Sequence, residues 1–235
     1  MAKSFAHLAL AALLISTLLT ACSEQKLDYV PSQGEMSYDI NYSSDIKDLL
    51  GLSSKFLPRK MDGVYSPDGI KLSISGGLGL LHIDIVGTPS DSYVTIDING
   101  DKMLLPFAQL FPADSIAAHN GIHVEYSDTT ENICGWDSYS LSALCPSPDG
   151  DINIKIYYVA MENKTSQKIA DLPVDDIPGL VTAMSITKDY NNVTFMLNDI
   201  HKADNIKPST FNRPADFRLT NLSEVDSLIK SNIKQ

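Results

Sequence analysis

Short runs in which apolar and polar residues alternate with a period of two recur along most of this 235-residue chain. The clearest runs cover residues 37–42, 70–75, 81–85, 94–98, 152–158 and 193–197. Alternation of this kind is typical of antiparallel strands that bury one face and expose the other. Helical patterns are too few to cover the apolar face of so many strands, so the sheet must close on itself or pack on another sheet, and strong curvature into a barrel or half-barrel is the simplest solution. The sequence therefore predicts a mainly β protein.

Turn signals separate several of these runs. Pro67-Asp68-Gly69, Asn99-Gly100 and Pro148-Asp149-Gly150 each lie between two alternating segments. Such sequences supply the positive-φ positions that tight turns require. Three hairpins are therefore expected.

Two segments carry helical signals. Residues 45–53 place Ile46, Leu49 and Leu50 on one side of a short helix. Asn221 can cap a C-terminal helix that has Glu224 at its third position. The predicted fold is a curved antiparallel sheet forming a half-barrel, with one or two short helices and a C-terminal helix.

The N-terminus has the features of an export signal. Lys3 precedes an apolar segment, residues 5–20, that is too short and too interrupted for a membrane span of about 20 residues. It ends in Leu19-Thr20-Ala21-Cys22, which resembles the signal of bacterial lipoproteins. That resemblance implies removal of residues 1–21 and acylation of Cys22. An ordinary signal peptide, with Cys22 incidental, is the alternative.

After cleavage, residues 22–35 are expected to form a lipidated flexible tether and residues 36–235 a single half-barrel domain with its C-terminal helix. Two or three acyl chains would hold the protein on a bilayer, whereas one binds marginally. Ser23 follows Cys22 where the lipoprotein rule places Asp for inner-membrane retention, which favours the outer membrane.

Net charge restricts the partners. Loss of Lys3 leaves 17 basic against 29 acidic residues, a net charge of −12. Nucleic acid and anionic headgroups are repelled by such a surface, so membrane attachment must come from the lipid anchor. The remaining cysteines, Cys134 and Cys145, either form a disulfide, which needs a chain reversal near residues 140–142, or are two buried or partly buried thiols.

Several motifs resemble those of envelope half-barrels related to the lipoprotein carriers LolA and LolB. The first motif consists of residues 131–136 and the following turn and strand at residues 148–159. The second, residues 176–181, resembles the signature of GLPGLI-type members, and the third is residues 211–217. Trp136 replaces the family's Tyr, and the strand ends in Tyr157-Tyr158-Val159-Ala160 rather than Trp-Tyr-Thr. The resemblance spans residues 34–219 and implies a sheet wrapped around an apolar concavity, which accepts acyl chains in the carriers.

No catalytic, cofactor-binding or metal-binding motif is present in the sequence, which favours a protein that is not an enzyme. The predicted lining of a hydrophobic cavity consists of Trp136, Tyr157, Tyr158, Phe195, Phe211 and Phe217. The leading hypothesis is a membrane-anchored, non-catalytic envelope lipoprotein that binds a lipid or acyl ligand in its half-barrel. The alternative is a structural subunit with a filled core and an envelope protein as its partner.

Overall fold

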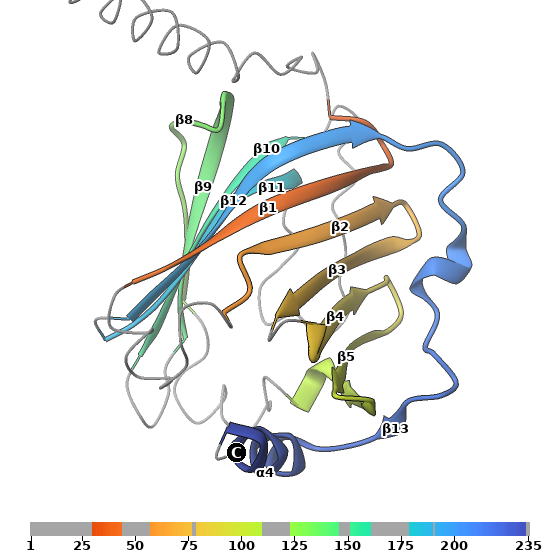
Figure 1. The fold of residues 1–235 in the computed structure, drawn as a ribbon. Helices are drawn as coiled ribbons and strands as arrows, with labels where there is room; N and C mark the ends of the chain where they lie inside the picture. The colour runs from red at the N-terminus through yellow and green to blue at the C-terminus, as the bar shows by residue number, and fades with distance from the viewer. Residues whose placement is uncertain are drawn as a thin grey trace, which may run out of the picture.

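The computed structural model describes residues 30–43, 57–76, 79–109, 123–145, 151–160, 179–189 and 191–233. In this part of the chain thirteen strands form one sheet (Figure 1). The strands of its first half are β1 (Gly34–Tyr42), β2 (Lys60–Ser66), β3 (Gly69–Gly76), β4 (Leu81–Gly87), β5 (Ser92–Ile98) and β6 (Asp101–Pro106). The others are β7 (His123–Tyr126), β8 (Glu131–Ile133), β9 (Trp136–Cys145), β10 (Ile152–Ala160), β11 (Gly179–Lys188), β12 (Asn191–Lys202) and β13 (Arg218–Leu219). The helical elements are the 3-10 turns η2 (Phe107–Gln109) and η3 (Pro208–Phe211), and α4 (Leu222–Ile233).

Each half of the sheet consists mainly of strands that are consecutive in the chain. Strands β1 to β6 pair antiparallel, each with the next, and so do β9 to β12, while β7 and β8 both pair with β9. The antiparallel pair of β1 and β12 joins the two halves. The short β13 pairs parallel with β6 at one edge, and β7 lies at the other. Within the described residues these edges do not pair with each other, so the sheet is open.

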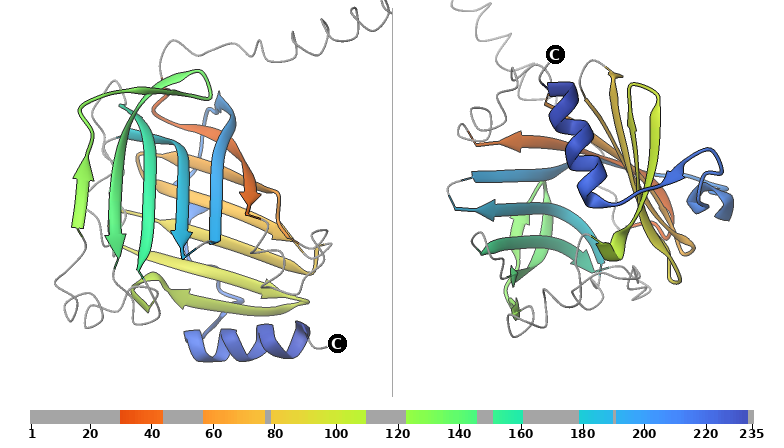
Figure 2. Two further views of the ribbon diagram at one scale, coloured as in Figure 1. Left: turned by 90° about the vertical axis from the view of Figure 1, so that its left-hand side faces the viewer. Right: turned by 90° about the horizontal axis from the view of Figure 1, so that it is seen from below.

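The sheet curves until its two halves face each other, as the two views in Figure 2 show. Register shifts occur at Ser37/Tyr38, between β1 and β12, and at Tyr157/Tyr158, between β10 and β11. Such bulges bend a strand and increase its twist. The expected fold class, a mainly β protein with a curved antiparallel half-barrel sheet and a C-terminal helix, is confirmed.

Cross-strand pairing assigns the side chains of β1 to β6 to two faces. Ile74 and Ile83 are paired and share one face, whereas the neighbouring pair Ser73 and Asp84 lies on the other. Val225 of α4 packs on the first of these faces, and α4 lies between the two halves of the sheet in the right-hand view of Figure 2. The apolar face is therefore the concave one, as the one-sided alternation predicted.

The turns confirm two of the three expected hairpins and correct one detail. Asn99 and Gly100 have φ values of 53° and 89°, as a tight turn between β5 and β6 requires. Gly69 begins β3 directly after the two-residue turn and is not among the positive-φ residues. Its role is steric, because a Cβ there would lie 2.6 Å from the carbonyl oxygen of Gly87. The turn at residues 148–150 lies outside the described residues, although the flanking β9 and β10 are paired.

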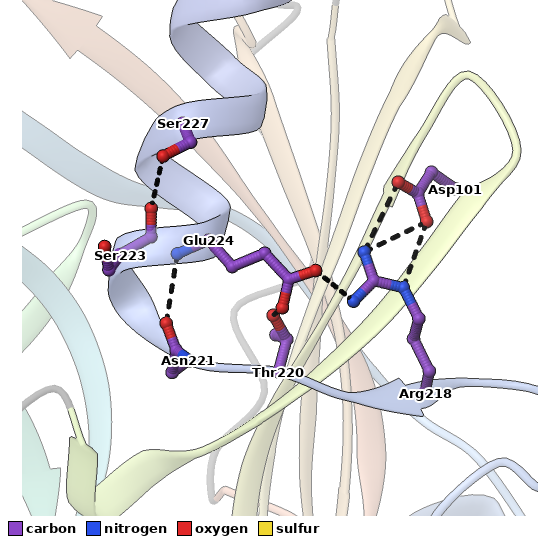
Figure 3. Close-up of polar contacts among 7 residues, drawn as sticks. All are labelled: Asp101, Arg218, Thr220, Asn221, Ser223, Glu224 and Ser227. Carbon is purple, nitrogen blue, oxygen red and sulfur yellow. Dashed lines mark hydrogen bonds and ion pairs between the residues drawn. The ribbon is translucent and has the colours of Figure 1, made fainter.

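Helix α4 has the predicted N-terminal cap. The side-chain oxygen of Asn221 accepts a hydrogen bond from the backbone N–H of Glu224 at 3.0 Å (Figure 3). The carboxylate of Glu224 accepts from Thr220 at 2.7 Å and from Arg218 at 2.5 Å, and Arg218 also contacts Asp101 of β6 at 3.4 Å. These contacts fix the start of α4 to the edge of the sheet. The helix expected over residues 45–53 lies outside the described residues.

The segment that leads into β13 covers part of the convex face. Phe211 of η3 is buried there against Val86, Tyr93 and Leu104. The C-terminal part of the chain thus crosses the outside of β4 to β6 before α4 reaches the concave side.

Candidate functional site

The concave face of β3 and β4 carries five half-buried apolar side chains, called here the concave row. Its members are Ile70, Leu72, Ile74, Ile83 and Ile85. Both strands are paired on each side, so their backbone edges are covered and the side chains reach solvent only across the face of the sheet. A filled core would bury such central residues completely. The concave row therefore offers apolar surface to a ligand.

Fully buried clusters flank this row. Met61, Tyr65 and Leu197 belong to a cluster at the seam of β1 with its neighbours. Met103 and Leu105 of β6 pack with Val225 of α4, and Leu228 contacts the same group. The core is therefore solid at the seam and under α4, and the less buried apolar surface lies between these two clusters.

The ionisable groups of the buried seam are neutral. The hydroxyl of Tyr38 donates to the carbonyl oxygen of Val181 at 2.8 Å, and that of Tyr65 donates to Pro31 at 3.1 Å. Burial raises the pKa of both tyrosines well above their usual value. The buried seam beside the concave row is therefore uncharged at these two positions.

The opposite half of the concave face carries an aromatic group of which the sequence indicated only Tyr158. Tyr139 and Tyr158 stack with ring centroids 6.0 Å apart, and Tyr126 lies on the adjacent β7. Tyr126 and Tyr139 are 50% and 38% exposed, whereas Tyr158 is buried. Burial raises the pKa of Tyr158. Tyr126 belongs to a strand of only four residues, too short for its alternation to be recognised.

The six aromatic residues predicted to line one cavity are divided among several places. Trp136 and Phe195 pack against the seam cluster, and Tyr158 belongs to the cluster around Leu141 and Ile156. Phe211 and Phe217 lie on the convex face. Tyr157 is placed apart from these clusters, with the Lys155 ammonium 4.6 Å from its ring centroid. Trp136, Tyr158 and Phe195 thus contact the core of the half-barrel, and the other three do not form a common lining with them.

The two cysteines lie beyond bonding distance. Cys134 is in the β8–β9 turn and Cys145 ends β9, which runs without reversal between them. Ten extended residues span about 30 Å, so the predicted alternative of a disulfide does not apply and both thiols are free. Cys22 and most of the expected tether lie outside the described residues. The folded part begins earlier than predicted, because Val30 is buried and β1 starts at Gly34.

Apart from the apolar cluster around Phe211, the convex face carries two shallow grooves with polar side chains. One has a volume of about 380 Å³ and includes Glu35, Asp62 and Lys71, and the other, of about 390 Å³, includes Ser142, Ser185 and Thr187. Beside the first, Asp84 accepts a hydrogen bond from Ser73 at 2.6 Å and pairs with Lys71 at 2.9 Å.

Burial raises the pKa of Asp84, but Ser73, Lys71 and His82, whose Nε2 lies 3.0 Å from the carboxylate, together outweigh it and hold the pKa below its usual value. In the described part of the chain, no three His, Cys, Asp or Glu side chains are arranged to hold a metal ion. The described helices also include none that is long and apolar enough to cross a membrane.

Comparison with known proteins gives a likeness of fold. No family model and no curated protein matches the chain. Two crystal forms of PNGF-II match 85% and 84% of it, with 9% and 8% identity and TM-scores of 0.50 and 0.48. The chain spans about a third of the length of those structures, 34% and 33%. The match at 0.50 shows a shared fold and nothing of function.

Two lipoproteins were also matched at a greater structural distance. The Mycobacterium tuberculosis lipoprotein LppX has a TM-score of 0.36 and 10% identity, and LprF from Mycobacterium bovis has 0.31 and 11%. Each match covers 74% of this chain and 89% of the other. Scores this low carry no argument about function. The expected membership of the GLPGLI-type group has no support from the family comparison.

Proposed function

We propose that this protein is a membrane-anchored, non-catalytic envelope lipoprotein that binds a hydrophobic ligand, such as an acyl chain, on the concave face of its half-barrel. The observation that carries the proposal is the concave row, which leaves apolar side chains half-buried on two inner strands that are each paired on both sides. Each CH₂ that a ligand buries there contributes about 0.8 kcal/mol.

The arrangement supports a long, flexible ligand. The concave row extends across β3 and β4 between two packed clusters, and Tyr126 and Tyr139 provide exposed aromatic surface on the facing half of the sheet. Apolar pockets with few polar groups bind through buried area, with little directional constraint. An acyl chain matches that surface because it needs no hydrogen bonds from the protein.

Photo-cross-linking in cells tests ligand binding. Cells that express the protein are given a photoactivatable fatty acid and are irradiated. The protein is then purified, and its modified peptides are mapped by mass spectrometry. Cross-links that depend on irradiation are expected in β3, β4 and β9. Fatty acid incorporated into the anchor at Cys22 is distinguished because it appears without irradiation.

Matched tryptophan substitutions locate the site. Ile83→Trp or Ile74→Trp fills the concave face and should reduce the cross-linking yield at least fivefold, whereas Met196→Trp adds the same bulk on the convex face and should not. Met196 pairs with Asp39, and is 36% exposed. Circular dichroism checks that each variant is folded.

Cross-links confined to the convex face, or a single stable protein partner with no lipid, would favour the structural-subunit alternative.

The anchor has a separate test. Cys22→Ser should move the protein from the membrane fraction to the soluble fraction and abolish labelling with palmitate, because acylation requires the thiol. Retention of the variant on membranes would contradict the anchor without affecting the ligand proposal.

A further inference from the structure

Polar side chains form two parallel rows across five strands of the convex face. The first row is Glu125, Ser142, Lys155, Ser185 and Thr194, each the cross-strand partner of the next. The second row is His123, Leu144, Asn153, Thr187 and Asn192, paired in the same way. Neighbouring strands are about 4.8 Å apart, so each row extends roughly 19 Å. The two rows define an elongated strip on the side of the sheet opposite to the concave row.

The groove of about 390 Å³ lies along this strip. Its volume is at the lower end of the range for small-molecule sites, which is about 300–1,000 Å³. Its lining includes the hydroxyl groups of Ser142, Ser185 and Thr187 and the amide of Asn153, with Leu144 as an exposed apolar surface beside them. This composition provides hydrogen bonds together with one patch for aliphatic C–H groups.

Asn192 orients two hydroxyl groups of the groove. Its Nδ2 donates to Ser185 Oγ and to Thr187 Oγ1, both at 2.8 Å. The orientation of the amide is fixed because Thr194 donates to Asn192 Oδ1 at 2.7 Å. A hydroxyl that already accepts from Asn192 keeps its own proton for another acceptor. Ser185 and Thr187 are therefore preorganised donors, two positions apart on the same strand.

The charges of the strip disfavour an anionic ligand. The Lys155 ammonium lies over the ring of Tyr157 and 3.6 Å from a Glu131 oxygen, so its charge is already partnered. Glu125 stands at the end of the first row and would repel an anion. Its carboxylate and the neighbouring His123, 3.1 Å away, instead supply polar groups opposite the two donors.

We propose that this strip is a binding site for a neutral saccharide, with Ser185 and Thr187 donating to its oxygen atoms and Leu144 contacting its C–H face. A sugar ring combines closely spaced hydroxyl oxygens with aliphatic C–H groups, which matches the alternation of donors, acceptors and apolar surface in the groove. The rows run across the strands, so a short linear oligosaccharide lies along them. The site is distinct from the concave face and does not depend on the lipid proposal.

The test measures binding of cellobiose, maltose and N,N′-diacetylchitobiose to the full-length protein by saturation-transfer NMR and calorimetry. The detergent must lack a sugar headgroup, because an alkyl maltoside would compete. At least one disaccharide should bind at millimolar concentration. The double variant Ser185→Ala/Thr187→Val should raise its Kd about tenfold, since it removes two hydrogen bonds while retaining the shape of the strand.

Matched variants separate this site from others. Ser37→Ala removes a hydroxyl from the other convex groove, and Ile83→Trp changes the concave face, and both should leave the Kd of the disaccharide unchanged. Absence of binding by all three sugars, or equal affinity of the double variant, would overturn the proposal. The proposal would also be overturned if inorganic phosphate bound, if the double variant lost that binding, and if the sugars did not bind, because the strip would then be an anion site.

Discussion

Tyr93 and Phe211 are separated by 118 positions in the sequence, and the Tyr93 hydroxyl donates to the carbonyl oxygen of Phe211 at 3.1 Å. Tyr93 is 1% exposed and Phe211 3% exposed, so the bond is shielded from water. Burial raises the pKa of Tyr93 to about 12, which keeps the hydroxyl protonated as a donor. The contact secures the segment before β13 to the convex face.

Tyr93→Phe should lower the free energy of unfolding by about 1–3 kcal/mol, because the Phe211 carbonyl group loses its donor while the ring stays buried. Urea denaturation measures the change. Tyr126→Phe is the control. Tyr126 is half exposed, so removal of its hydroxyl should change the free energy of unfolding by less than about 0.5 kcal/mol. Equal effects of the two variants would show that the bond to Phe211 contributes nothing.

Gly69 and Gly100 should tolerate substitution differently. At Gly69 any Cβ meets the Gly87 carbonyl oxygen, so both Gly69→Ala and Gly69→Asn should destabilise the protein by about 1–3 kcal/mol. At Gly100 there is open space and φ is 89°, so Gly100→Ala should cost about 1–2 kcal/mol and Gly100→Asn less, because Asn accepts the left-handed region more readily. Thermal unfolding of the four variants provides the comparison. A smaller loss for Gly69→Asn than for Gly69→Ala would contradict the steric explanation.

Ser138 and Thr182 form a buried hydroxyl pair, with oxygen atoms 2.8 Å apart and both residues fully buried. Ser138→Ala leaves the buried Thr182 hydroxyl without its Ser138 partner and should cost about 1–3 kcal/mol. Thr182→Val should cost less, because the Ser138 hydroxyl can still donate to the Trp136 carbonyl oxygen at 3.2 Å. The double variant should cost less than the sum of the two, since the bond between the two hydroxyls is lost only once. A double-mutant cycle from chemical denaturation measures this coupling, and strict additivity would mean that the pair is not coupled.

Asp84 should make stability depend on pH in the acid range. Its pKa in the folded state is below the usual value of about 3.9, because Ser73 and Lys71 stabilise the carboxylate against the opposing effect of burial. A depressed pKa contributes stability that is present above the unfolded-state pKa and is lost as the pH falls through the folded-state pKa. The difference in unfolding free energy between the native protein and Asp84→Asn should therefore be largest near neutral pH and shrink below about pH 4.

Urea midpoints at several pH values provide that measurement. Asp128→Asn, at an exposed position, serves as the control and should show a nearly constant difference. A difference for Asp84→Asn that does not change between pH 3 and pH 7 would exclude the carboxylate as its origin.

The sequence predicted the strands better than their connections. Alternation in runs such as residues 70–75 and 81–85 depends on the local sequence alone, and these runs form β3 and β4 with the expected face inward. The β8–β9 hairpin was missed because Cys134 occupies a left-handed position, with φ of 52°, where Asn or Asp is the usual signal. Gly69 was assigned to the wrong physical role for a similar reason, since a close approach of Gly87 is a tertiary contact that no local pattern contains.

The candidate site was predictable in kind but not in its residues. One-sided strands imply an apolar face, and the concave row consists of residues from those strands. Which aromatic residues join it depends on the bulges and on the path of the C-terminal segment. Phe211, for example, was expected in the lining because it belongs to a motif that resembles the carriers, but it packs on the outside with Tyr93 and Leu104. The strip across β7 and β9 to β12 was overlooked because polar residues on an exposed face carry no periodic signal of binding.

The pairing of β1 with β12 has a consequence for how the protein folds during synthesis. Most strand pairs, including β1 with β2, join strands that are consecutive in the chain, but β1 also pairs with β12, where Gly34 lies opposite Lys202. Closing so long a stretch of chain carries a large entropic cost and is slow. During synthesis from the N-terminus, the edge of β1 that pairs with β12 therefore stays unpaired until β12 has been synthesised.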